Sequence, residues 1–299
     1  MLNAKKLRLT GSDRWFYVID YTLLSFMGLI IILPLMHVFS QAFSDPQSVL
    51  TGRVVFWPRH FTLNTIKLIL RNPNIKTGYI NTLFYASAGT VINLTMTIMC
   101  AYPLSRTGLT GRNAIMLLFT FTMMFGGGMI PTYILIKDLG LIDTRWVMLL
   151  PGAMTVWNMI LARTFLQNTI PKEMYESADL DGASNIRILV SIVLPLSAPI
   201  IAVLTLFYAV GHWNSYFDAM MYLRSQRLFN IQLILRNAIS NISALLNQSD
   251  NLAEMEKTMA YAEASKYAII VISMVPVLII YPFVQKYFIK GIMIGAIKG

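Results

Sequence analysis

The chain has 299 residues, of which 56% are hydrophobic and only 13% are charged, and its formal net charge is +10. Soluble domains carry about 25% charged residues, so this composition excludes a water-soluble protein and predicts an integral membrane protein. The basic residues are dispersed among apolar segments and form no basic face, so the positive charge does not indicate a nucleic-acid partner.

Residues for catalysis or metal binding are sparse. The single cysteine, Cys100, lies in an apolar run, and the three histidines are scattered, so neither a disulfide framework nor a metal site is expected. The chain has no phosphate-binding loop of the Gly-x-x-x-x-Gly-Lys-Ser/Thr type, no His-Glu-x-x-His motif and no Gly-x-Ser-x-Gly motif. We therefore expect no enzyme activity, no catalytic residue, no metal and no cofactor in this chain.

Apolar segments of membrane-spanning length, about 20 residues, recur along the chain and leave no room for a soluble domain. The expected spans are residues 17–39, 79–105, 114–137, 146–165, 188–213 and 267–288. Residues 1–299 are thus predicted to form a single transmembrane domain. The basic start of the chain (Lys5, Lys6, Arg8 and Arg14) leads into the first span, which favours a retained helix over a cleaved signal.

The third expected span contains the run Gly126-Gly127-Gly128. Such a run lets the helix break, and a break can line a translocation path. Close helix packing, or a loop at the membrane edge, explains the glycines equally well.

Polar and aromatic residues gather in the fourth span and at the end of the fifth. Polar side chains at membrane depth usually face the bundle interior or a water-filled cavity, and rings and amides are typical sugar ligands. An interfacial aromatic belt is the alternative for Trp213, Tyr216 and Tyr222. A structural role is expected for His212. The candidates for a substrate path are Trp157, Asn158, Tyr208, Trp213, Asn214, Tyr216 and Asp218.

The stretch from Pro171 to Ser184 is acidic in a mostly apolar chain. Pro171 suits the first turn of a helix, and Glu173 and Glu176 lie near its positive end. Gly182 supplies a stop, and Ser184 or Asn185 can cap the next helix. The pattern predicts a short, water-facing helix on which something outside the membrane docks.

This stretch resembles the signature loop of ABC-importer permeases, which reads Glu-Ala-Ala, three residues, Gly, nine residues and Ile-x-Leu-Pro. Here the motif is Glu176-Ser177-Ala178, Gly182 and Ile192-Val193-Leu194-Pro195, with Ser177 replacing the second alanine. The longer pattern is similar to the carbohydrate-importer branch typified by the maltose permease. The resemblance implies an all-α integral membrane fold, the six-helix fold of type I ABC importer permeases.

The resemblance also implies that residues 168–187 form a cytoplasmic coupling loop held in a cleft of the ATP-binding subunit. The residues expected to couple to the ATPase are Glu173, Tyr175, Glu176, Ser177, Ala178, Asp181, Gly182 and Ala183. Residues 1–14 become a cytoplasmic tail, and residues 223–266 become an outer loop that contacts the binding protein. The positive-inside rule gives this orientation only weak support, because most of the outer basic residues lie in long loops that the rule does not count.

The expected protein is a multi-pass permease of the bacterial cytoplasmic (inner) membrane, with both termini cytoplasmic. Its implied partners are a second, different permease, two ATP-binding subunits that bind ATP and Mg, an external solute-binding protein and the lipid bilayer. The expected cargo is an oligosaccharide, with an acidic, polysaccharide-derived one as a candidate. The alternatives are a permease for a non-sugar solute, an integral membrane enzyme and a passive channel.

Overall fold

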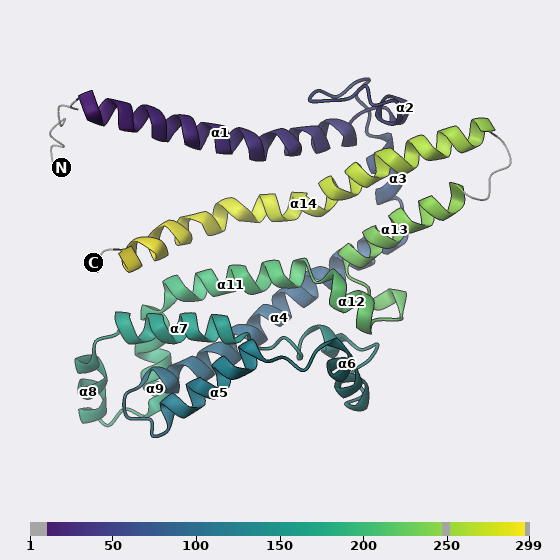
Figure 1. Cartoon of the computed structure of the whole chain (residues 1–299). Helices are drawn as coiled ribbons and strands as arrows, with labels where there is room; N and C mark the ends of the chain where they lie inside the picture. The colour runs from purple at the N-terminus through teal and green to yellow at the C-terminus, as the bar shows by residue number, and fades with distance from the viewer. Residues whose placement is uncertain (1–10, 247–251, 297–299) are drawn as a thin grey trace. The chain divides into compact units, whose positions relative to one another are not determined.

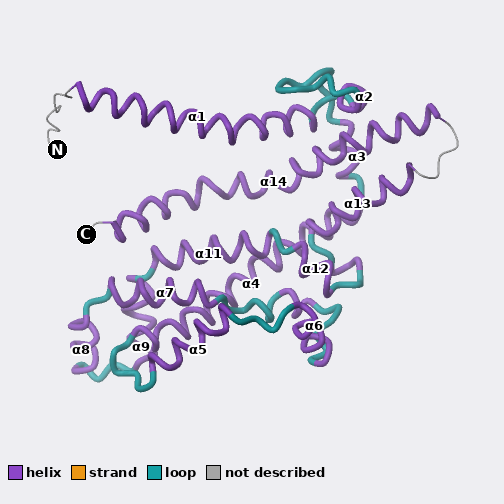
Figure 2. The backbone as a smooth tube through the Cα atoms, viewed as in Figure 1, coloured by secondary structure: helices purple, strands orange, loops and turns teal. Residues whose placement is uncertain are grey.

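The computed structural model describes residues 11–246 and 252–296. Within those ranges all regular structure is helical (Figure 2). The chain divides into two compact units, Met1–Arg71 with Ile239–Ile272 and Asn72–Ala238 with Ser273–Gly299. The longer helices are α1 (Gly11–Ala42), α4 (Pro73–Ser105), α5 (Arg112–Met124), α6 (Met129–Asp138), α7 (Val156–Thr169), α11 (Ala198–Trp213), α13 (Ile231–Leu246) and α14 (Leu252–Ala296).

Short helical segments connect these long helices. They are α2 (Pro46–Leu50), α3 (Asn64–Leu70), η1 (Arg145–Met148), α8 (Lys172–Leu180), α9 (Asn185–Ile188), the π-helical turn η2 (Leu189–Val193), α10 (Leu194–Leu196), α12 (Tyr216–Tyr222) and η3 (Gln226–Leu228).

The first unit is organised around the C-terminal end of α1. The most apolar 18-residue window of the span Arg14–Ala42 has a mean hydropathy of 2.2, and none of this window is buried within the chain. A helix that is apolar and unburied in its own fold is suited to lipid or to another membrane helix. At its end, Ser40 and Gln41 donate hydrogen bonds to the carbonyls of Phe56 and Val54, which fixes the loop that follows.

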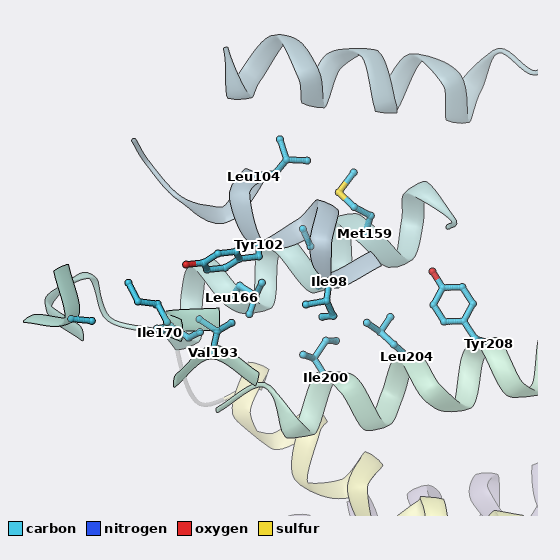
Figure 3. Packing of buried hydrophobic residues seen from close by; sticks show 14 residues of the cluster. Ile98, Tyr102, Leu104, Met159, Leu166, Ile170, Val193, Ile200, Leu204 and Tyr208 are labelled. Atoms are coloured by element: carbon cyan, nitrogen blue, oxygen red, sulfur yellow. The ribbon is translucent and has the colours of Figure 1, made fainter. Parts of the chain in front are cut away.

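The core of the second unit lies where α7 and α11 pack along α4 (Figure 1). Ala101 on α4 and Ala162 on α7 are fully buried, and such small side chains let membrane helices approach closely. Around them lie larger apolar side chains, among them Ile98, Met159 and Leu204 (Figure 3).

Two of the expected spans are broken rather than continuous. The segment expected over 114–137 forms α5 and α6, which meet at 110°, and the segment over 188–213 bends by 81° between the Asn185–Leu196 helix and α11. Gly128 takes φ +86, and Cβ atoms at Gly126 and Gly128 would meet nothing within 4 Å. The glycines therefore lie at a chain break, and Gly126 and Gly128 pack closely against no other part of this chain.

The fourth expected span, 146–165, is wrong as a continuous helix. It consists of η1, a turn around Pro151 and Gly152, and α7, whose 14 residues reach only about 21 Å. In the part of the chain that the structure describes, three single helices are long and apolar enough to cross a membrane, and each bent pair can supply one more span.

The stretch expected as an outer loop, 223–266, is largely helical. It contains η3, α13 and the first turns of α14, a 45-residue helix that also includes the expected span 267–288. The beginning of the stretch 223–266 is attached to α4. Asn81 donates hydrogen bonds to the carbonyls of Arg227 and Phe229, and the Tyr85 hydroxyl donates to the carbonyl of Leu228. Of the tail expected over 1–14, residues 1–10 lie outside the described residues.

Candidate functional site: the signature helix and a polar cavity

The acidic signature stretch forms α8, bounded by the signals that its sequence carries. Pro171 stands at the N-cap, and Glu173 lies in the first turn, near the positive end of the helix dipole. The chain leaves the helix at Gly182, whose φ of +71 favours glycine, while the Ala183 N–H donates to the carbonyl of Ala178 at 3.0 Å. Ser184 then caps α9 by accepting a hydrogen bond from the Arg187 N–H at 3.3 Å.

The two faces of α8 have different surroundings. Ala178 is buried, and it packs with the half-buried Tyr175 and Ala183 against the chain's own core. The opposite face is acidic and open, and Leu180 at its end is 90% exposed. A shallow groove of about 350 Å³ runs along the helix. Its lining residues are Glu173, Met174, Ser177, Ala178, Asp181 and Ile192.

This geometry divides the expected coupling residues into two groups. An exposed group is available to a partner, and an inward group positions the helix on the rest of the chain. The exposed residues are Glu173, Glu176, Ser177, Asp181 and Gly182, and the inward ones are Tyr175, Ala178 and Ala183.

Arg106, at the end of α4, holds α8 against that helix. Its guanidinium lies 4.1 Å from the centre of the Tyr175 ring, and its Nη2 is 3.2 Å from Oδ2 of Asp179. Burial raises the pKa of the Tyr175 hydroxyl, which therefore stays neutral under the cation. The sequence alone does not predict this role of Arg106, because nothing local indicates a contact with a helix about 70 residues away.

A cavity of about 440 Å³ lies in the second unit, next to the α4, α7 and α11 core. It brings together Asn158, Tyr208 and Asp218 from the expected substrate-path residues. The other lining residues are Asn93, Thr132, Val147, Met148, Pro151, Gly152, Thr155, Phe207, Gly211, His212, Ser215 and Tyr222.

Hydrogen bonds fix the polar groups around the cavity. The Tyr208 hydroxyl is 2.7 Å from Oγ1 of Thr97 and accepts a hydrogen bond from the Thr155 N–H. Nε2 of His212 is 2.7 Å from Oδ1 of Asn93, which is buried on α4. His212 therefore makes a structural hydrogen bond between α11 and α4, as expected, and it also lines the cavity.

The remaining expected substrate-path residues do not line the cavity. Trp157 is 60% exposed, and Asn214 is also exposed. The buried Trp213 donates its indole N–H to the carbonyl of Ser273. The Tyr216 hydroxyl accepts a hydrogen bond from Arg236, whose guanidinium lies 5.2 Å from the ring centre.

Sequence reasoning missed Asn93 and Thr97. Both are polar, both belong to a predicted span, and their four-residue spacing places them on one face of α4. This spacing could have identified both residues as candidates for a polar site. The sequence does not show which neighbouring helix each of them faces.

Comparison with known proteins identifies the class. The chain belongs to the family described as binding-protein-dependent transport system inner membrane components, whose model matches residues 93–294 and so includes both α8 and the cavity. It is therefore a permease subunit of an ABC importer in the inner membrane, with the fold that the signature loop implied. This membership sets aside a membrane enzyme and a passive channel.

Individual relatives match along nearly the whole chain. The polygalacturonan/rhamnogalacturonan transport system permease protein YtcP of Bacillus subtilis is 38% identical, with 96% of this chain and 99% of the relative covered. Protein LplC of the same organism is 37% identical, with 97% of each covered. A crystal structure of a bacterial ABC transporter involved in the import of the acidic polysaccharide alginate contains a chain with TM-score 0.82 and 35% identity, covering 93% of this chain and 98% of that chain.

Proposed function

We propose that this chain is one of two different permease subunits of an importer for acidic, polysaccharide-derived oligosaccharides. The observation that carries the proposal is the similarity along nearly the whole chain to a permease named for polygalacturonan/rhamnogalacturonan transport, at 38% identity, and to a chain of an alginate importer, at 35% identity. The polar cavity supports a hydroxyl-rich cargo, because its lining offers amide, hydroxyl, imidazole and carboxyl groups.

In this proposal α8 is the coupling helix. Its exposed acidic face docks in a cleft of an ATP-binding subunit, and ATP and Mg²⁺ are bound by the two ATP-binding subunits and not by this chain. Closure of those subunits moves α8, and Arg106 carries the movement to α4 through Tyr175 and Asp179. The closure switches the cavity between inward-facing and outward-facing conformations. These two conformations of the permease must bind the partner subunits with different affinities for the switch to be driven.

The remaining assignments concern topology. A solute-binding protein docks on the segment 223–266, and both termini lie on the cytoplasmic side with α8. The contact between Arg106 and Asp179 is consistent with this arrangement, because alternating spans place both loops on one side of the membrane.

The test is the ATPase activity of the reconstituted complex with its binding protein, screened against neutral and uronate oligosaccharides. We expect uronate oligosaccharides to stimulate hydrolysis and to accumulate inside the vesicles. Stimulation by neutral sugars alone would overturn the acidic cargo. Stimulation only by a peptide or an amino acid, in an intact complex, would overturn the carbohydrate assignment and favour a non-sugar importer.

The coupling role of α8 has its own test at Gly182. A valine there would be strained by the φ of +71, whereas an asparagine tolerates this conformation. We expect Gly182→Val to abolish cargo-stimulated ATPase and Gly182→Asn to retain most of it, with membrane insertion unchanged in both. Gly52→Val, at a φ of +66 in the other unit, is the matched control. Full stimulation in Gly182→Val would contradict the assignment.

A further inference from the structure

Asn93 joins three parts of the cavity wall. It is 1% exposed on α4, its side-chain nitrogen donates to the carbonyl of Gly152, and its Oδ1 is 2.7 Å from Nε2 of His212 on α11. A backbone carbonyl has no hydrogen to give, so the amide nitrogen of Asn93 must face Gly152 and its oxygen must face His212. The orientation of this amide is thereby determined by chemistry.

The orientation of Asn93 fixes the proton on His212. An amide oxygen only accepts hydrogen bonds, so Nε2 of His212 must carry the hydrogen. In neutral imidazole the other nitrogen, Nδ1, is then an acceptor. Among the described residues no protein group donates a hydrogen bond to Nδ1.

The packing of the ring indicates where Nδ1 lies. A Cβ placed on Gly89 would be 2.2, 2.5 and 2.8 Å from Nε2, Cε1 and Cδ2 of His212, so this edge of the ring lies directly on α4. Nδ1 belongs to the other edge of the ring, and His212 is a lining residue of the cavity. Nδ1 is therefore the polar atom of the ring that remains for a bound molecule.

We propose that Asn93 holds His212 as the Nε2–H tautomer, and that the bare Nδ1 accepts a hydrogen bond from a hydroxyl group of the cargo. This deepens the proposed function and rests on it for the nature of the cargo. The carboxyl group of Asp218 adds a second acceptor to the same cavity, and the lining contains neither lysine nor arginine. The cavity of this chain thus contacts hydroxyl groups of an oligosaccharide and offers no cationic side chain to the cargo carboxylates.

The tautomer can be measured without cargo. Nitrogen-15 NMR of the assembled complex, labelled on histidine, gives the His212 signals as the difference between the wild type and His212→Gln. We expect a protonated Nε2 and an unprotonated Nδ1, and a mixture of tautomers in Asn93→Ala. A protonated Nδ1 in the wild type, or an unchanged tautomer in Asn93→Ala, would overturn the inference and leave the proposed importer standing.

The acceptor role is tested by transport. His212→Leu removes the acceptor, and we expect uptake per ATP hydrolysed to fall about three- to tenfold, the factor that one lost hydrogen bond carries. Thr205→Val, on α11 but outside the cavity lining, should keep the wild-type ratio. A wild-type ratio in His212→Leu would overturn the acceptor role. A wild-type complex that takes up no saccharide would instead overturn the proposed function.

Discussion

At the level of single residues, the packing of His212 against Gly89 leaves no room for a side chain on this part of α4. The imidazole lies where the side chain of any larger residue at position 89 would be, with its Nε2 only 2.2 Å from an ideal Cβ. The ring is also held by its hydrogen bond to Asn93, so a Cβ at position 89 can be accommodated only by moving the ring away from α4 and stretching that bond. Glycine at position 89 is therefore required by packing and not by backbone conformation.

We predict that Gly89→Ala displaces His212 and destabilises the complex by about 1–3 kcal/mol, the usual cost of overpacking a core. Thermal unfolding can be followed by the reaction of the single cysteine, Cys100, with a thiol-reactive dye. Gly211→Ala, on α11 with nothing within 4 Å of its Cβ, should not lower the unfolding temperature. Equal midpoints for Gly89→Ala and the wild type would show that the ring does not occupy this position.

A second residue that stabilises the fold is Asp143, which lies in the loop between α6 and η1. The Ser225 hydroxyl and the N–H groups of Ser225 and Arg224 donate to its carboxylate, and these hydrogen bonds lower the pKa of Asp143 below its ordinary 3.8. Because the folded pKa is lowered, the carboxylate stabilises the fold above about pH 4 and this contribution is lost as pH falls through the folded pKa.

We therefore expect the unfolding temperature of the wild type to fall more steeply below about pH 4 than that of Asp143→Asn, whose side chain does not titrate. Differential scanning fluorimetry from neutral to acidic pH measures this difference. Asp138→Asn removes a neighbouring carboxylate without these hydrogen bonds and should follow the wild-type profile. Identical profiles for Asp143→Asn and the wild type would contradict the role of Asp143.

At the scale of elements, α8 is attached to α4 mainly by side chains. The Arg106–Asp179 pair is partly exposed, with side-chain exposures of 25% and 53%, and such pairs contribute only about 0–1 kcal/mol. The stacking of Arg106 on Tyr175 adds about 0.5–1 kcal/mol. These contacts are too weak to determine folding, but in the proposed coupling role they bias how α8 moves relative to α4.

Replacing Arg106 should therefore affect coupling more than stability. We predict that Arg106→Ala lowers uptake per ATP hydrolysed about two- to fivefold, with little change in unfolding temperature. Arg187→Ala removes the same charge from the neighbouring helix α9, where no side-chain ion pair holds it, and should leave the ratio unchanged. If Arg106→Ala lowers the unfolding temperature but leaves uptake per ATP hydrolysed unchanged, the contact stabilises the fold and does not contribute to coupling.

At the scale of the whole molecule, the broken spans distinguish this permease from a bundle of straight helices. The bend of 110° between α5 and α6 and that of 81° before α11 place irregular backbone within expected membrane segments. Such backbone is tolerated only where protein or a water-filled cavity covers it. Thr132 on α6 and Tyr208 on α11 both line the polar cavity, which agrees with that requirement.

The topology makes a prediction for the whole chain. In a Cys100→Ser background, we expect Leu180→Cys and Asn3→Cys to react with a membrane-impermeant maleimide only from the cytoplasmic side. Trp57→Cys, at a residue 76% exposed in the first unit, should react only from the outer side. Labelling of positions 3 and 180 from opposite sides would overturn the assignment of the N-terminus.

The class of protein and the position of its signature helix can be predicted from the amino-acid sequence alone. Composition excludes a soluble protein, and α8 with its turn and the following cap follows from Pro171, Gly182 and Ser184, because capping and backbone preferences act over a few residues. The spans at 17–39 and 79–105 lie within α1 and α4 for the same reason, since a long apolar run needs no distant partner to be recognised.

Where the other spans bend, and which polar residues contact one another, depends on tertiary packing. Asn93, Gly152 and His212 are separated by 59 and more residues, and so are Arg106 and Asp179, so no local pattern predicts that they touch. For the same reason, only some of the expected substrate-path residues line the cavity, since whether a polar residue faces a cavity or a neighbouring helix depends on the packing of both helices.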